Sequence, residues 1–388
     1  MKSLLISGAY FPPQTGGISR TMGTIASALG GNEVCCLTAV PSASADEEDL
    51  PDVAIYRRPK AFAKRRATQA LGFSAAVAEI MLRERPQLVQ LATAYEGYMG
   101  LWLQRWLNLP FIIYAHGNEI FGALRSSWPK PRLSLVKAAR VLANSRFTAE
   151  LVEKAGADPA RIEVIHAGCD VNRFRPVVAS GEVRHELVGS SDRAPVILSV
   201  GGLVERKGHD MVIAALPKLV ESFPKLVYLI VGDGPCRSNL ETLALKAGVA
   251  ANVIFAGKIT DERLPYAYSV CDAFVMPSRH REEFGDVEGL GLVYLEASAC
   301  AKPVVGGRSG GVPDAVIDGV TGFLADPSSP EDIASAISRL LSSPELAARL
   351  GRQGRDHVLA EFTWPQFADR VRRICNEVAG EHARNSKR

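Results

Sequence analysis

The sequence of 388 residues is poor in cysteine, has no strong excess of charge and lacks a long apolar run. Its seven cysteines are scattered without a CxxC pair, so neither a disulfide framework nor a zinc site is predicted. A formal net charge of +3 gives no general reason to expect a nucleic-acid partner. No segment reaches the roughly 18 uncharged apolar residues of a membrane span, and the short first apolar run leads into a glycine-containing turn, unlike a signal peptide. We therefore expect a cytoplasmic enzyme.

The chain has the length and the apolar content of two globular domains. Its 388 residues are more than one hydrophobic core usually holds. A content of 47% hydrophobic and 22% charged residues is typical of ordered protein. Short apolar runs alternate with helical stretches, as in parallel sheets that are covered by helices. In the first half these runs are 4–7, 33–38, 53–56, 87–91, 111–114, 141–143 and 163–165. In the second half they are 195–200, 226–231, 253–255, 273–276, 303–305 and 322–324.

The alternation lapses around residues 168–191, a stretch that contains proline and glycine, and we place a domain boundary there. The sequence thus predicts an α/β protein with two Rossmann-like, doubly wound domains that face a cleft. The first domain is expected at 1–175 and the second at 190–365. A last helix at about 366–381 is expected to return to the first domain.

Two glutamates bracket a glycine-containing turn in the second half of the chain. Glu288 stands before the turn and Glu296 after it. The turn itself is Gly289, Leu290, Gly291, Leu292 and Val293. A glycine-rich turn that opens a helix presents free backbone N–H groups and a positive dipole end. Carboxylates at its two ends can accept hydrogen bonds from sugar hydroxyls, although an isolated pair of this kind is also explained by a helix-start acid and a solvated helical charge.

The first half offers two further candidates. Gly16 and Gly17 lie between the first strand and an expected helix, where glycine lets a phosphate or a sugar approach the backbone. The pattern is not GxGxxG, which counts against a dinucleotide-binding oxidoreductase. His116 ends an apolar run, so we expect its side chain at the carboxyl edge of the sheet, where open α/β folds bind ligands.

The segment DVEGLGLVYLEA resembles the E-x7-E signature of retaining glycosyltransferase family 4, and its wording is similar to the phosphatidyl-inositol mannosyltransferase branch. The resemblance covers nearly the whole chain, and its motifs follow one another in the order that is usual for the family. Further matching motifs are Gly16-Gly17, His116-Gly117-Asn118-Glu119, Asn144-Ser145, Gly168-Cys169-Asp170, Gly232-Asp233-Gly234, Pro277-Ser278 and Gly310-Gly311-Val312-Pro313. It implies the GT-B architecture, with the acceptor bound by the first domain and the nucleotide sugar by the second.

The resemblance also implies roles for single residues. Glu296 matches the acid that holds the ribose hydroxyls, and Glu288 matches the one that holds hydroxyls of the transferred sugar. His116 would lie beside the reacting sugar. Lys207 matches the phosphate-binding lysine, whose charge suits a departing diphosphate. The donor-binding residues are expected to be Gly16, Gly17, Arg206, Lys207, Lys258, Ile259, Glu288, Gly289, Leu290, Gly291, Leu292, Val293 and Glu296, and the catalytic ones His116 and Glu288.

The motif around Lys207 departs from the family at one position. Gly202 stands where an arginine that clamps the diphosphate is usual. Arg206, directly before Lys207, is the nearest candidate to substitute. In the alternative, Arg206 points to solvent and the backbone amides of Gly289–Val293 and Gly16–Gly17 suffice.

The resulting hypothesis is a retaining, metal-independent glycosyltransferase without a cofactor. It would move a hexose-type sugar from a nucleoside-diphosphate sugar to the hydroxyl of a small-molecule, glycan or lipid-linked acceptor, by a front-face mechanism. Nucleic acid is not expected as a partner, and peripheral contact with the inner face of the cell membrane stays open. Two alternatives stay open as well: a GT-B sugar phosphorylase or nucleotide-sugar epimerase, and a non-catalytic protein that binds nucleotide sugars.

Overall fold

The computed structural model describes residues 1–42, 50, 52–125, 129–189 and 194–386. It divides into two compact units. The first consists of Met1–Ala167 together with Trp364–Arg388, and the second of Gly168–Thr363.

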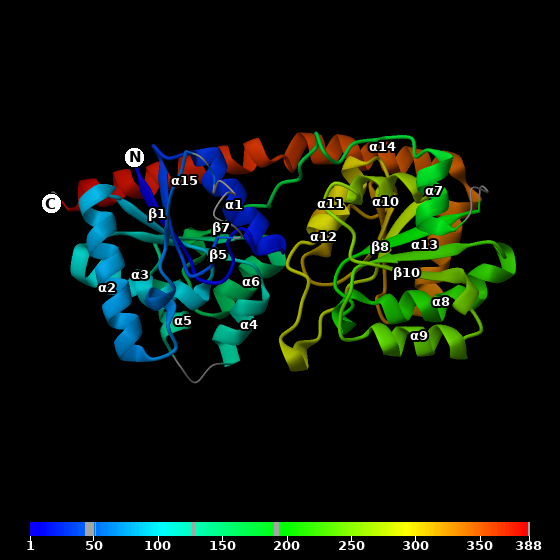
Figure 1. Ribbon diagram of the computed structural model, residues 1–388, viewed down its shortest axis with the longest axis horizontal. Helices are drawn as coiled ribbons and strands as arrows, with labels where there is room; N and C mark the ends of the chain where they lie inside the picture. The colour runs from blue at the N-terminus through cyan, green and yellow to red at the C-terminus, as the bar shows by residue number, and fades with distance from the viewer. Residues whose placement is uncertain (43–49, 51, 126–128, 190–193, 387–388) are drawn as a thin grey trace. The chain divides into compact units, whose positions relative to one another are not determined.

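The first unit is built on a parallel sheet of seven strands in the order β3-β2-β1-β4-β5-β6-β7 (Figure 1). The strands are β1 (Ser3–Ser7), β2 (Val34–Thr38), β3 (Ala54–Arg57), β4 (Leu88–Leu91), β5 (Phe111–Ala115), β6 (Arg140–Ala143) and β7 (Ile162–Val164). In β1, β2, β4 and β5 every residue is buried. Strands covered on both faces read as continuous apolar runs, which is why the sequence pattern located them.

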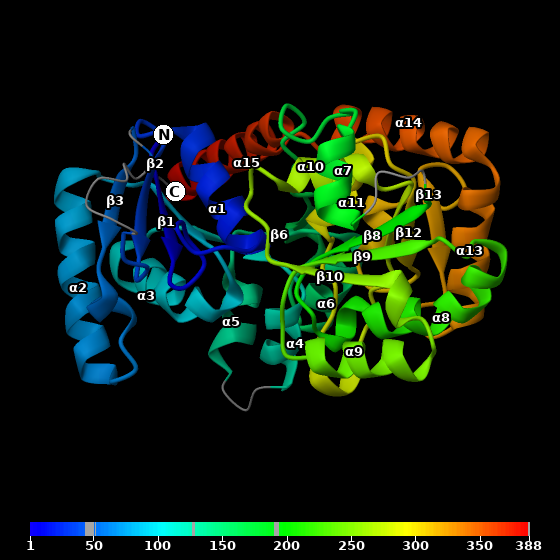
Figure 2. The ribbon, with the colours of Figure 1, turned by 45° about the vertical axis from the view of Figure 1, so that its right-hand side comes forward.

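Helices cover both faces of this sheet (Figures 1 and 2). They are α1 (Gly17–Leu29), α2 (Arg66–Arg83), α3 (Gly97–Leu107), α4 (Asn118–Arg125), α5 (Lys130–Lys137), α6 (Arg146–Lys154) and α15 (Trp364–Asn385), with short 3₁₀ turns η1 (Pro59–Phe62), η2 (Ala94–Glu96) and η3 (Pro159–Arg161). The last helix, α15, packs beside α1. Its residues Phe367, Val371 and Ile374 share one buried cluster with Leu5 and Met22. The end of the chain is therefore part of the first core.

The second unit has a parallel sheet of six strands in the order β10-β9-β8-β11-β12-β13. Its strands are β8 (Val196–Val200), β9 (Val227–Val231), β10 (Val253–Gly257), β11 (Ala273–Met276), β12 (Val304–Gly307) and β13 (Gly322–Ala325). Its helices are α7 (Gly181–Val188), α8 (His209–Ser222), α9 (Arg237–Lys246), α10 (Leu264–Val270), α11 (Leu292–Ala299), α12 (Val312–Ala315), α13 (Pro330–Ser342) and α14 (Pro344–Glu361), with 3₁₀ turns η4 (Glu205–Lys207), η5 (Ala250–Asn252) and η6 (Glu282–Phe284).

Each sheet reverses its strand order at one place. In the first sheet this switch lies between β1 and β4, and in the second between β8 and β11. Helices that follow neighbouring strands on either side of a switch leave on opposite faces, so the carboxyl ends of these strands border a natural binding crevice. The loops after β8 and β11 are therefore the first place to look for a ligand site in the second unit.

The predicted α/β class with two Rossmann-like, doubly wound domains is confirmed, and every apolar run predicted from sequence overlaps a strand. The sequence placed the boundary between residues 175 and 190. The first domain was therefore predicted too long, because residues 168–175 lie with the second unit in the structure. The backbone N–H of Cys169 donates to the carbonyl of Phe362 at 2.7 Å, and Arg173 lies 3.2 Å from Asp261 in an ion pair. Among the described helices, none combines the length and the apolar character required to span a bilayer.

Candidate active site

Two loops at the switch point of the second sheet are tied together by their backbones. The loop after β8 leads through Gly201 and Gly202 into η4, which carries Arg206 and Lys207. The loop after β11 begins at Pro277. The backbone N–H of Arg279 in this loop donates to the carbonyl of Arg206 at 2.8 Å. Residues that follow two different strands are thereby held at one edge of the sheet.

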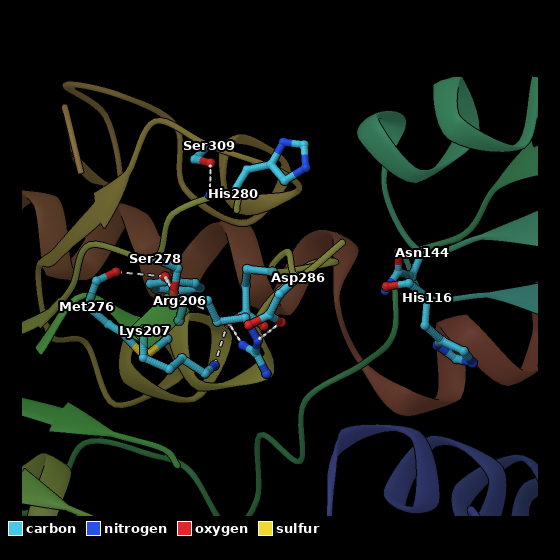
Figure 3. Close-up of polar contacts among 11 residues, drawn as sticks. His116, Asn144, Arg206, Lys207, Met276, Ser278, His280, Asp286 and Ser309 are labelled. Carbon is cyan, nitrogen blue, oxygen red and sulfur yellow. Dashed lines mark hydrogen bonds and ion pairs between the residues drawn. The ribbon is translucent and has the colours of Figure 1, made fainter. Parts of the chain in front are cut away.

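The carboxylate of Glu288 is the centre of a polar cluster at this edge. Figure 3 shows Arg206, Lys207 and Ser278, which surround it. Its Oε2 atom accepts from Lys207 Nζ at 2.5 Å, from Arg206 at 3.0 Å and from the hydroxyl of Ser278 at 3.3 Å. The side chain of Glu288 is 13% exposed and that of Lys207 11%. All three donors converge on one oxygen. The other oxygen, Oε1, has no hydrogen-bond partner among the described residues.

The charges around Glu288 keep it ionised. Burial alone would raise the pKa of this carboxyl, but the cations of Lys207 and Arg206 and the hydrogen bonds from Lys207 and Ser278 hold its pKa below the usual value. A buried carboxylate survives in this form only when it is paired and hydrogen-bonded. Glu288 is therefore a fixed anion with one acceptor atom to spare.

Arg206 contacts a second acid, Asp286. Its Nε atom lies 2.8 Å from Asp286 Oδ1, while another of its nitrogens, Nη1, faces Glu288. Arg206 and Lys207 reach the same carboxylate oxygen, and the substitution of Arg206 for the family's usual arginine stays a prediction. Two of the three guanidinium nitrogens are engaged by acids, which leaves Nη2 without a partner in the described part of the chain.

The glycine-containing turn leads into the start of α11. Gly291 is the residue before the helix and has φ of 87°, in the left-handed region. A Cβ at this position would lie 2.4 Å from the Tyr294 ring, so both the backbone conformation and the packing demand glycine. Gly291, Leu292 and Val293 are half-buried, whereas Gly289 and Leu290 are buried. The first backbone N–H groups of α11 thus form a partly open helix start beside Glu288.

Glu296, the expected ribose ligand, is a buried side chain. It is 2% exposed, and its Oε2 atom accepts from the Tyr268 hydroxyl at 2.8 Å. Burial, followed by the charge of Glu296, raises the pKa of Tyr268 well above its usual value, so the phenol remains a donor. The role of Glu296 in holding ribose hydroxyls therefore stays a prediction.

Sequence reasoning assigned no role to Ser278, Asp286 and Tyr294. The Tyr294 hydroxyl lies 2.7 Å from the Met276 carbonyl and 3.0 Å from Ser278 Oγ, so this side chain of α11 anchors the start of the loop after β11. Ser278 belongs to the Pro277-Ser278 motif. Asp286 and Tyr294 stand within the signature segment, but nothing in their spacing marks them as part of a hydrogen-bonded cluster.

The predicted residues of the first unit lie at the carboxyl edge of its sheet. His116 follows β5, and its Nε2 atom lies 2.9 Å from the carbonyl of Ala92, which follows β4. A carbonyl only accepts, so Nε2 carries a hydrogen, and in the neutral ring Nδ1 is then the acceptor. The backbone N–H of His116 donates to buried Glu119, and Asn144 Nδ2 donates to the His116 carbonyl at 3.3 Å. The Asn144 Oδ1 atom is buried without a partner among the described residues.

Of the remaining candidates, Gly16, Gly17 and Lys258 are exposed and Ile259 is half-buried. Gly16 precedes α1 with φ of 133°, and an added Cβ would meet no atom within 4 Å, so the start of α1 is open. Gly17 is exposed as well. Lys258 and Ile259 follow the edge strand β10, where Lys258 is exposed and has no ion pair with the described residues. His, Cys, Asp and Glu side chains form no group of three or more that could hold a metal ion within the described residues.

Two family models match the chain and together follow its two units. The model described as Glycosyltransferase Family 4 matches residues 15–173, and the one described as Glycosyl transferases group 1 matches residues 184–357.

Curated relatives carry names of mannosyltransferases and inositol glycosyltransferases. A GDP-mannose-dependent alpha-(1-6)-phosphatidylinositol monomannoside mannosyltransferase from Mycolicibacterium smegmatis is 42% identical over 57% of this chain and 57% of its own length. The corresponding monoacylated-substrate enzyme of Corynebacterium glutamicum is 35% identical over 68% of this chain and 69% of its own. A D-inositol 3-phosphate glycosyltransferase from Actinosynnema mirum is 32% identical over 89% of this chain and 82% of its own. The match thus spans just over half the length of the mycobacterial relative.

Solved structures share the fold across nearly the whole chain. A sucrose-phosphate synthase from Thermosynechococcus elongatus has a TM-score of 0.81 at 23% identity, covering 98% of this chain and 100% of the other. Anabaena HepE in complex with UDP and glucose has a TM-score of 0.77 at 21% identity, covering 97% and 100%. The predicted GT-B architecture is confirmed.

Proposed function

The chain belongs to glycosyltransferase family 4, and on that basis we propose that it moves a hexose-type sugar from a nucleoside-diphosphate sugar to an acceptor hydroxyl with retention. The observation that carries the proposal is the state of Glu288. Three donors hold one of its oxygens in place and keep it ionised, while the other oxygen has no partner among the described residues. An oriented carboxylate with a spare acceptor is suited to a sugar hydroxyl.

The diphosphate of the donor would bind beside Glu288. Lys207 supplies a positive charge, Arg206 supplies its remaining Nη2 donor, and the first amides of α11 supply a helix N-terminus. These groups stabilise negative charge without a metal ion, because they are already in place when the diphosphate leaves. The lysine is a point charge, whereas the helix start offers directed N–H groups. We therefore propose metal-independent transfer with no cofactor.

The chemical step would take place on one face of the sugar. The acceptor oxygen bonds to the anomeric carbon on the side from which the diphosphate departs, and the acceptor proton passes to an oxygen of the departing phosphate. No carboxylate nucleophile is needed, so the protein contributes positioning and electrostatic stabilisation. Glu288 would hold the transferred sugar, Glu296 the ribose, and His116 would contact the sugar near the reacting carbon through Nδ1.

The donor and the acceptor are proposed from the names of the relatives. GDP-mannose is the first donor to test, because relatives are named for their dependence on it. UDP-glucose follows, because HepE was solved with UDP and with glucose. Inositol phosphates and phosphatidylinositol mannosides are the first acceptors, in line with the names of the relatives.

A lipid-linked acceptor would require peripheral contact with the inner face of the membrane. Exposed Lys60, Lys64 and Arg65 precede α2, whose Leu71 is 75% exposed. Basic residues beside exposed apolar ones favour anionic lipid surfaces. Co-sedimentation with phosphatidylinositol vesicles but not with neutral vesicles is expected. Recovery with neither kind of vesicle would contradict membrane contact, and equal recovery with both would contradict the preference for anionic lipid.

The proposal is tested by a thermal-shift panel of nucleotide sugars, followed by product analysis. A donor at about a hundred times its dissociation constant adds about 2.7 kcal/mol of stability. The stabilising donor is then incubated with and without acceptor, and the anomeric configuration of the product is determined by NMR. Transfer with retention supports the proposal. Sugar phosphate formed with inorganic phosphate would favour a phosphorylase, an isomerised donor an epimerase, and binding without turnover a non-catalytic protein.

A further inference from the structure

The guanidinium of Arg206 is held between two acids. Its Nε atom pairs with Asp286 Oδ1 at 2.8 Å and its Nη1 atom with Glu288 Oε2 at 3.0 Å. A long side chain such as arginine loses considerable rotamer freedom when it is fixed, and two contacts on different nitrogens define both the position and the plane of the group. Arg206 thereby connects Asp286 to Glu288, two residues further along the chain.

Asp286 is itself placed by a short, tightly bonded loop. The backbone N–H of Arg281 donates to the Asp286 carbonyl at 2.8 Å, and the Asp286 N–H donates back at 3.3 Å. Between them lie η6 and Gly285, whose φ of 61° lets the chain reverse. The Arg281 side chain pairs with Glu205 at 2.5 Å, directly before Arg206. The loop is therefore anchored to the same turn that carries the arginine.

The position of the Arg206 guanidinium affects Glu288, because Arg206, Lys207 and Ser278 all contact its Oε2 atom. Lys207 holds the carboxylate as a point charge and the Ser278 hydroxyl lies farther away at 3.3 Å, whereas the planar guanidinium adds a directed bond of 3.0 Å. If Asp286 did not hold Nε, the Arg206 cation would be free to follow the charge of a diphosphate and to leave Glu288. The carboxylate would then keep its charge but lose its orientation.

We propose that Asp286 is a positioning residue for sugar transfer: it holds Arg206 so that Arg206 fixes the orientation of Glu288. This inference rests on the proposed function, in which the spare oxygen of Glu288 binds a hydroxyl of the donor sugar. Asp286 acts through Arg206 and contacts no donor atom. It should therefore affect turnover more than the binding of the nucleoside diphosphate.

A double-mutant cycle tests the proposal by activity. Asp286→Ala should lower kcat about tenfold and should change the Kd of free nucleoside diphosphate less than about threefold, since Lys207 and the α11 amides remain. In the Arg206→Ala background, Asp286→Ala should have almost no further effect on kcat. Asp286→Asn, which keeps an oxygen for Nε but not the charge, should fall between wild type and Asp286→Ala. Asp318→Ala is the matched control, because Asp318 pairs with Arg308 at 2.9 Å in the same unit and contacts none of the cluster.

Two activity results would overturn the proposal: equal losses of kcat in both backgrounds, or a loss of nucleoside-diphosphate affinity as large as the loss of kcat. A second readout does not depend on activity. NMR of nitrogen-15 arginine side chains should show a protected Nε–H signal in the wild type that disappears in both Arg206→Lys and Asp286→Ala. An unchanged signal in Asp286→Ala would also overturn it. If the wild type turns over no donor but this signal behaves as expected, the proposed function fails while the placement of Arg206 by Asp286 stands.

Discussion

Replacing Gly202 by arginine should tighten the binding of nucleoside diphosphate. This position carries an arginine in the family that the sequence resembles, and the structure has room for one. Gly202 is exposed, its φ lies outside the left-handed region, and an added Cβ would meet only the Asp233 carbonyl at 3.9 Å. The preceding Gly201 lies against the Lys207 side chain, because a Cβ there would be 3.6 Å from Lys207 Cε. An arginine at 202 would thus start beside the proposed diphosphate site.

The expected gain is modest because two effects oppose each other. A charge-assisted hydrogen bond contributes about 1.5 to 3 kcal/mol. Fixing the long side chain costs about 1 to 1.5 kcal/mol of rotamer freedom. The midpoints of these two ranges differ by about 1 kcal/mol, which corresponds to about a fivefold lower Kd. The gain should shrink at high salt, because the site is partly exposed.

Isothermal titration calorimetry with nucleoside diphosphate and with the matching nucleoside measures this gain. Gly202→Met adds a side chain of similar length without charge, and Gly181→Arg adds the charge at the start of α7, where an added Cβ meets no atom within 4 Å. Neither control should bind the diphosphate more tightly, and nucleoside affinity should be unchanged in all three variants. An unaltered or weaker affinity in Gly202→Arg, in a variant that melts like the wild type, would refute the placement of the diphosphate beside Gly202.

Three further predictions concern the same site. Glu296→Gln should weaken nucleoside-diphosphate binding while Glu288→Gln mainly lowers turnover, and normal nucleotide binding by Glu296→Gln would remove its ribose role. The pKa of Glu288 is held below its usual 4.5, so its ionised form stabilises the second unit above pH 4.5, and this contribution is lost as the pH falls further. The free energy of unfolding in urea should therefore differ most between wild type and Glu288→Gln near neutral pH. A difference that grows on acidification would contradict the lowered pKa. Activity should survive excess EDTA, since Lys207 and the α11 amides supply the positive charge, and a loss that magnesium or manganese restores would argue for a metal.

Part of the candidate site could be predicted because its residues stand in one short segment. Glu288, the glycine-containing turn and Glu296 follow one another in the chain. Glycine before a helix indicates a turn with unusual backbone angles, which can be recognised from the local sequence. The same holds for Gly16 before α1. Their proximity to Lys207 came from resemblance to a family and not from spacing, since more than eighty positions separate the two segments.

Other features followed from long-range packing that no local pattern encodes. Asp286 gains its role only because the loop after β11 meets the turn after β8, which brings its carboxylate to Arg206. Buried Glu296 accepts a hydrogen bond from Tyr268 of α10, which stands 28 positions away in the chain. The attachment of residues 168–175 to the second unit depends on a backbone bond to Phe362, nearly two hundred residues away. The sequence marked that stretch as a break but assigned its part up to residue 175 to the first domain, whereas it belongs to the second unit.

The sequence by itself determined the two alternating series of strands and helices, because a strand buried on both faces must be apolar along its length wherever it lies. It also determined where the backbone needs glycine, because that requirement arises within one turn. Only the tertiary structure decided which charges share one oxygen of Glu288 and which nitrogen of Arg206 is left over. Those contacts arise where the switch in strand order brings the ends of β8 and β11 together. A parallel sheet joins strands that are distant in the chain, so the partners of a buried charge are set by the sheet and not by its neighbours in sequence.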